Sequence, residues 1–188
     1  TLAAITNVDA NDVITFTTTD TSVDASDLVA LAVKVDTLGV NTVNTVTEVY
    51  NTASLGTVVV NALNITGNTE AVIITGGSIS STDTNAIVNA TSGIVTATVS
   101  ADTAANLNTN LVNATATDVL TLTVSAGSVA ATDLTALDNK TSVAVNAAAV
   151  TALIGTAAEI QAAYTANTAG TISGLGNENI SISDTGTL

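Results

Sequence analysis

The sequence predicts an all-β fold, a β-solenoid (β-helix) with coils of about 24–30 residues paired into repeats of roughly 48–60 residues, and with short helical corners. The first observation is composition: hydrophobic residues make up 46%, yet only one Phe and two Tyr occur, and Trp and Met are absent. Small aliphatic side chains suit a thin, regular interior. The second is that the chain has no Pro. A Pro residue would remove a hydrogen-bond donor from a strand ladder, so its absence favours strands. The third is internal repetition.

A strand motif led by an acid occurs four times. The four acids are Asp12, Glu70, Asp118 and Glu178, and the intervals between them are 58, 48 and 60 residues. Each precedes an alternating apolar and polar run, which is typical of a strand. The segment 95–99 divides the middle interval into two halves of 24 residues. We therefore expect one domain, 1–188, with repeat units 12–69, 70–117 and 118–177 and a partial unit 178–188.

A corner motif follows three of these strands. It starts at Ser22, Ser78 and Ser128 and contains Ser-Asp or Thr-Asp before a short apolar spacing. This pattern predicts an N-cap that opens one helical turn. One longer segment, 156–165, has a helical pattern around Ile160 and predicts a short helix or a decorated corner within a coil.

A third motif centres on tyrosine. Tyr50 and Tyr164 lie 114 residues apart, and each has a glutamate upstream, Glu48 and Glu159. The alignment predicts that the two tyrosines occupy equivalent places in the repeat.

Charge excludes two classes of partner. The formal net charge is −14, and Lys34 and Lys140 are the only bases. Nucleic-acid phosphates and anionic membranes both require clustered Lys and Arg, so neither is expected as a partner. There is no Cys and no apolar run of roughly 18 residues, so neither a disulfide framework nor membrane insertion is predicted.

Catalytic chemistry has few candidates. The chain has no His and no Cys, which excludes Ser-His and Cys-His nucleophilic mechanisms. The glycines Gly170, Gly174 and Gly176 predict a turn between strands, because no phosphate-binding motif accompanies them. A glycosidase pair of acids would need aromatic platforms that the chain lacks. We therefore predict no enzyme and no catalytic, cofactor-binding or metal-binding residue.

Two binding hypotheses remain open. The acid-led positions are either solvated corners or a ladder of weak cation sites, and Asp20, Asp24 and Asp27 form the densest acidic cluster, so calcium is the cation to consider. The outward strand positions would form a hydroxyl face that suits an ice-binding plane, although Ile73 interrupts it; they are Thr15, Thr17, Thr96, Thr98, Thr121, Thr123, Ser181 and Ser183.

The segment Ala131-Thr-Asp-Leu-Thr-Ala-Leu-Asp-Asn-Lys-Thr-Ser142 resembles corners of giant tandem-repeat proteins from marine bacteria, cyanobacteria in particular. Segments 155–164 and 170–178 are similar to their linking segments. The resemblance covers 119–188 directly and the rest through the internal repeats. It implies a secreted or surface-attached protein with a structural or adhesive role.

Together these observations predict a structural repeat module of an extracellular filament, sheath or giant cell-surface protein. The alternatives are an adhesin stalk with weak calcium binding and an ice-binding solenoid. Segments 1–4 and 186–188 align with one corner of the repeat, so we expect a longer array. Open ends of such an array present unpaired strand edges, and the expected partners are copies of the chain or flanking repeats, joined end to end.

Overall fold

The computed structural model describes residues 7–17, 22–35, 37–41, 43–49 and 55–184. The chain divides into two compact units, one formed by Thr1–Ile79 with Asp83–Ala97, and the other by Ser80–Thr82 with Thr98–Leu188. Each unit is described by itself.

The predicted all-β β-solenoid is wrong. The described residues form a mixed α/β structure with six helices and parallel sheets. The corners expected at single helical turns are helices of eight to ten residues. Their buried residues recur three apart, as at Ala25, Leu28 and Leu31, which is the stripe of an amphipathic helix. The flanking Ser, Thr and Asp residues concealed this stripe.

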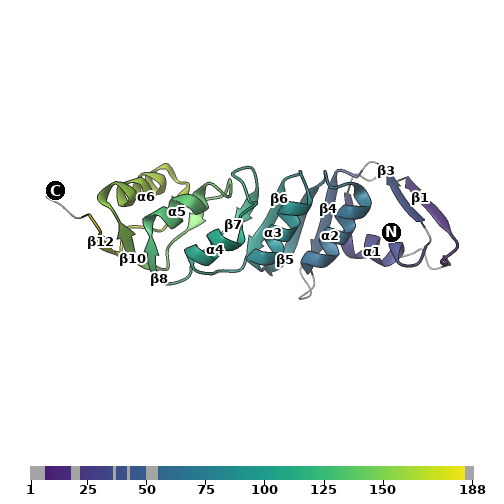
Figure 1. The fold of residues 1–188 in the computed structure, drawn as a ribbon, viewed down its shortest axis with the longest axis horizontal. Coiled ribbons are helices and arrows are strands. Elements are labelled where there is room, and N and C mark those ends of the chain that lie inside the picture. The colour runs from purple at the N-terminus through teal and green to yellow at the C-terminus, as the bar shows by residue number, and fades with distance from the viewer. Residues whose placement is uncertain (1–6, 18–21, 36, 42, 50–54, 185–188) are drawn as a thin grey trace. The chain divides into compact units, whose positions relative to one another are not determined.

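The first unit is built from parallel strands and the helices that connect them. In chain order its elements are β1 (Val13–Thr17), β2 (Ser22–Asp24), α1 (Ala25–Ala32), β3 (Thr37–Asn41), β4 (Thr45–Val49), α2 (Leu55–Thr66) and β5 (Ala71–Ile79). β1 pairs with β3, and β4 lies between β2 and β5. α1 packs against α2, as Figure 1 shows. After β5 come α3 (Ser81–Ala90) and β6 (Val95–Val99), and β6 is the next strand beyond β5.

The second unit has the same construction. Its elements are α4 (Ala104–Asn110), β7 (Val119–Thr121), β8 (Gly127–Ala130), α5 (Ala131–Asp138), β9 (Val145–Asn146), β10 (Val150–Gly155), α6 (Ala157–Ala169), β11 (Ile172–Ser173) and β12 (Asn179–Ile182). β10 lies between β8 and β12, and β9 pairs with β11, all in parallel. α5 packs against α6 (Figure 1).

The two units repeat one another. Asp12 and Asp118, Ser22 and Ser128, and Lys34 and Lys140 are each separated by 106 residues. From β1 to β5 and from β7 to β12 the described strands and helices follow in the same order, apart from β11, which has no counterpart among the described elements before β5; α3, β6 and α4 lie between these two stretches. This period of 106 residues covers the first two intervals between acid-led strands, which are 58 and 48 residues long.

Each three-stranded ladder carries one row of aliphatic side chains in its core. In the first unit Val23 pairs with Val46, and Val46 with Val72, and all three are buried. In the second unit the row runs from Val129 through Leu153 to the strand β12. Among the described residues, none of the helices has the length and apolar character needed to cross a bilayer.

The helix expected at 156–165 is confirmed as α6. Thr156 is its N-cap and forms a capping box with Glu159, and Gly170 ends it in the left-handed conformation. The caps expected at Ser26-Asp27 are placed differently. Asp24 is the N-cap of α1, and Asp27 lies in the first turn, where its charge suits the helix dipole.

Candidate functional site

The four acid-led positions divide into two geometries. Asp12 and Asp118, in the equivalent places before β1 and β7, each close a tight turn. The Asp12 Oδ2 atom accepts the N–H of Asp9 at 2.9 Å, and the Asp12 N–H donates to the Asp9 carbonyl at 3.1 Å. Asp118 makes the same two contacts with Thr115, at 3.0 and 3.1 Å. These aspartates therefore act as turn-closing carboxylates.

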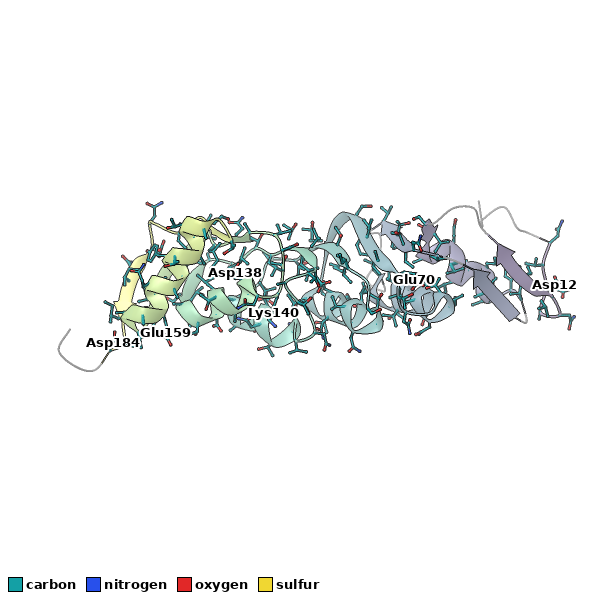
Figure 2. All side chains as sticks on the ribbon, turned by 90° about the horizontal axis from the view of Figure 1, so that it is seen from above. Asp12, Glu70, Asp138, Lys140, Glu159 and Asp184 are labelled. Atoms are coloured by element: carbon teal, nitrogen blue, oxygen red, sulfur yellow. The ribbon has the colours of Figure 1, made fainter. Side chains whose placement is uncertain are left out.

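The two glutamates close a different turn before β5 and β12. The Glu70 Oε2 atom accepts the N–H of Thr69 at 2.9 Å. The Glu178 Oε2 atom accepts the N–H groups of Gly176 at 2.7 Å and Asn177 at 3.0 Å. Figure 2 labels Glu70 and Asp12, which represent the two geometries in the first unit.

The interpretation of these acids as solvated corners is wrong for two of them. Glu70 is 2% exposed and Asp118 is 4% exposed. A buried carboxylate requires hydrogen-bond donors, and the preceding backbone N–H groups supply them. These four acids are thus part of the turns that precede the strands.

The acidic cluster considered as an alternative calcium site is only partly within the described residues, since Asp20 lies outside them. Asp24 caps α1: its Oδ1 atom accepts the Asp27 N–H at 3.0 Å and the Ser26 hydroxyl at 2.7 Å. Among the residues that the structure describes, no group of three or more acidic side chains is arranged to hold a metal ion.

Adding Ca²⁺ is expected to leave the melting temperature unchanged relative to NaCl at equal ionic strength. The Asp12, Glu70, Asp118 and Glu178 carboxylates already bind backbone N–H groups, so calcium would have to displace these. Differential scanning calorimetry checks this, and the NaCl series removes the general screening of the acidic surface. A rise in melting temperature specific to Ca²⁺ would contradict the expectation.

Glu48 is the buried acid of β4, 3% exposed. Its carboxylate accepts the N–H groups of Ser26 at 2.9 Å and Val49 at 3.1 Å. Burial raises the pKa of Glu48, and the nearby Asp24 charge raises it further, although the backbone hydrogen bonds act in the opposite direction. A raised pKa also occurs in catalytic acids, but both Glu48 oxygens face backbone N–H groups.

The two glutamates of the tyrosine motif do not occupy equivalent positions. Glu48 lies in β4, whereas Glu159 lies in the first turn of α6. Tyr50 is outside the described residues. Tyr164 lies in α6, and its hydroxyl donates a hydrogen bond to the Glu178 Oε1 atom, which joins this helix to the turn before β12.

This contact shifts both groups. Burial alone would raise the pKa of Glu178, but hydrogen bonds from the Tyr164 hydroxyl and from backbone N–H groups outweigh it and lower the pKa. The hydrogen bond to Glu178 raises the pKa of Tyr164 to about 12, with smaller effects of burial and of the Glu178 charge.

Tyr164→Phe is expected to lower the free energy of unfolding at neutral pH by about 1 kcal/mol, because a partly exposed hydrogen bond to a charged group is lost. The contribution of Glu178 is present above its ordinary pKa of 4.5 and is lost as the pH falls through its lower folded value. The contribution of Tyr164 is present below pH 10 and is lost as the pH rises through about 12. Urea unfolding of both proteins across pH checks this, and a constant difference at acid pH would contradict it.

The predicted hydroxyl face is discontinuous. Thr98, Thr121, Ser181 and Ser183 are exposed, and Thr96 and Thr123 are half-buried. Ile73 and Val119, at 37% and 36% exposed, interrupt the outward positions. The side chains of Thr15 and Thr17 lie outside the described part. The glycines Gly174 and Gly176 lie between β11 and β12 with positive φ, as the turn prediction requires.

A Thr-Ser pair closes the connection after α3 and again after α5. The Thr91 hydroxyl donates to the Glu70 carbonyl at 2.6 Å and accepts the Gly93 N–H at 2.9 Å. The Thr141 hydroxyl donates to the Leu120 carbonyl at 2.7 Å and accepts the Leu120 and Val143 N–H groups, each at 3.0 Å. These residues bind the strand 21 residues earlier.

Thr141 and Ser142 are the last two residues of the segment that carries the family resemblance. The resemblance therefore covers the connection after α5, but it did not predict the hydrogen bonds of Thr141 with Leu120 and Val143.

β12 and the two residues that follow it are held to the second unit by backbone pairing and by one side-chain contact. β12 is hydrogen-bonded to β10 on one side, and the Ser183 N–H donates to the Gly155 carbonyl at 2.8 Å. Asp184, beside the start of α6 in Figure 2, accepts the Ala157 N–H at 2.7 Å and so fixes the strand to that helix. Ile180 and Ile182 are 44% and 48% exposed.

No protein-family model, curated protein or solved structure matches the chain.

Proposed function

We propose that the chain is a structural, non-catalytic module of an extracellular filament, sheath or giant cell-surface protein. The observation that carries this proposal is the tandem repeat of one parallel strand-and-helix unit within the chain, in both copies of which an aspartate closes the turn before the first strand. Repetition of one structural unit is typical of proteins that build length.

The use of polar side chains supports a structural role. The carboxylates of Asp12, Asp118 and Glu178 and the hydroxyl of Thr141 all bind backbone groups of the chain itself. An active site would instead need such groups to converge on an accessible space beside a substrate.

Charge supports a soluble module that does not aggregate side by side. A net charge of −14 with two bases favours solubility and resists lateral aggregation of a protein rich in strands. The resemblance of 131–142 to surface and secreted tandem-repeat proteins supports a location outside the cell.

Immunogold electron microscopy of native cells tests the proposal. Antibodies raised against the purified chain are expected to label filaments, a sheath or the cell surface, and mild protease treatment of intact cells is expected to remove the label. Label confined to the cell interior would exclude the proposed location.

The two alternatives require features that the described residues do not favour. A calcium-stiffened stalk needs carboxylates free to bind cations, but the acid-led carboxylates bind backbone N–H groups. An ice-binding face needs an unbroken row of hydroxyls, and Ile73 and Val119 interrupt it.

A further inference from the structure

A groove lies between the helices α5 and α6 of the second unit, and its volume is about 590 Å³. α6 lines it with alanines four residues apart, Ala158, Ala162 and Ala166, which share one face of the helix. The end of α5 lines it with Asp138 and Asn139, and Figure 2 labels Asp138. The groove therefore combines a methyl surface with polar side chains.

The polar side chains of the groove offer acceptors more than donors. The Asn139 Nδ2 atom donates to a carbonyl of α5 at 2.9 Å, and the Thr171 hydroxyl donates to the Asp138 Oδ2 atom at 2.8 Å. The Gln161 Nε2 atom donates to the Thr165 hydroxyl oxygen at 3.4 Å. Within the described residues, the Asp138 Oδ1, Asn139 Oδ1 and Gln161 Oε1 atoms accept no hydrogen bond. A ligand that suits this groove brings hydrogen-bond donors.

The carboxylate of Asp138 lies where its own helix disfavours it. Asp138 is the last residue of α5, at the negative end of the helix dipole, and the last turn contains no basic residue. Lys140, beyond the end of the helix, donates to the Leu111 carbonyl at 2.8 Å. In the first unit the equivalent residue, 106 positions earlier, is Ala32. The helix of this unit can thus form without the acid, and a bound cation would offset the unfavourable charge.

We propose that this groove binds a primary alkylammonium group, with the ammonium at Asp138 and the alkyl chain along the alanines of α6. An ammonium carries one positive charge and three N–H donors, which match the carboxylate and its neighbouring oxygen acceptors. Calcium would require about six to eight oxygen ligands, and the described residues contain no group of three acids suited to a metal. Methylene groups, unlike a hydrated ion, gain from contact with methyl side chains.

This ligand chemistry has two sources, a free aliphatic diamine and the lysine side chain of a partner protein. The net charge of −14 attracts either one. The inference goes beyond the proposed structural function and does not depend on it.

Amide NMR spectra of the intact chain at fixed ionic strength test the inference. The probes are 1,5-diaminopentane and, separately, a lysine-containing tripeptide with blocked ends. Both are expected to cause saturable shifts at the amides of Ala158, Ala162, Ala166 and Asn139, whereas pentanol, which lacks the charge, is expected to cause none. Tighter binding of the tripeptide assigns the groove to a partner's lysine, and binding of the diamine alone assigns it to a free amine.

Asp138→Asn is expected to weaken the binding of diaminopentane at least about tenfold, because the charge is lost. The asparagine keeps an oxygen for the Thr171 hydroxyl, so the melting temperature is expected to stay the same or to rise. Asp27→Asn, in the first turn of α1, removes the same charge elsewhere and is the matched control. It is expected to change the affinity by no more than about twofold.

Ala162→Leu tests the methyl surface. The larger side chain fills the groove and is expected to weaken binding at least about tenfold. Ala136→Leu is the matched control, because Ala136 is exposed on α5 and does not line the groove.

Three results would each overturn the inference. They are no saturable shift with either probe, shifts spread over the acidic surface that Asp27→Asn and Asp138→Asn reduce equally, and binding that Ala162→Leu leaves unchanged. All three leave the proposed function intact, because the immunogold experiment tests location independently of ligand binding.

Discussion

Gly93→Ala is expected to lower the free energy of unfolding of the first unit by about 3 kcal/mol, the upper range for an overpacked site. A Cβ atom at position 93 would lie 2.6 Å from the Ala71 nitrogen and against the Glu70 carbonyl group, all of them backbone atoms. The backbone there is also fixed, because the Gly93 N–H donates to the Thr91 hydroxyl. Relief of the clash would therefore require β5 and the Thr-Ser corner to separate.

Ser92→Ala is the matched control for this substitution. Ser92 is exposed, and its structural contact is made by its backbone N–H, which the alanine retains. Urea unfolding measures the loss, and hydrogen exchange of the Val72 amide, which donates to Ile94, assigns it to the pairing beyond β5. Equal stability of Gly93→Ala and Ser92→Ala would show that the close approach is not a constraint.

The strands were more predictable than the helices. The acid-led motif places strands at 12–16, 70–74, 118–122 and 178–182, and β1, β5, β7 and β12 each begin in one of these segments, although β5 continues to Ile79. Alternation over five residues is a local signal that the fold retains. The helix α5 carries only three buried residues, Ala131, Leu134 and Leu137, among Thr and Asp residues that favour caps and turns. Packing against α4 and α6 stabilises such a helix, and local sequence does not record that packing.

The roles of the polar residues were less predictable. The sequence identified an acid before each predicted strand, but it did not show that the aspartates and the glutamates close different turns. That distinction depends on which preceding N–H group each side chain can reach, one residue before Glu70 or three before Asp118. The contact of Thr141 with Leu120 joins residues 21 apart, so it exists only once the strands are aligned.

Thr141→Val is expected to destabilise the second unit by about 3 kcal/mol. Thr141 is 5% exposed, and its hydroxyl bonds to three backbone groups of Leu120 and Val143. Valine has nearly the same shape, so little packing is lost. The substitution instead deprives buried N–H and C=O groups of a partner, and a single such group costs about 1–3 kcal/mol.

The same exchange at two other threonines separates this effect from strand propensity. Thr121→Val, at an exposed position of β7, is expected to change the free energy of unfolding by no more than about 0.5 kcal/mol. Thr91→Val, at the equivalent corner after α3, is expected to cost less than Thr141→Val, because Thr91 is only half-buried and water can replace its hydroxyl. Urea unfolding of the three variants gives the order directly. If Thr141→Val were as stable as Thr121→Val, the hydroxyl would not be what holds this corner to the strand before it.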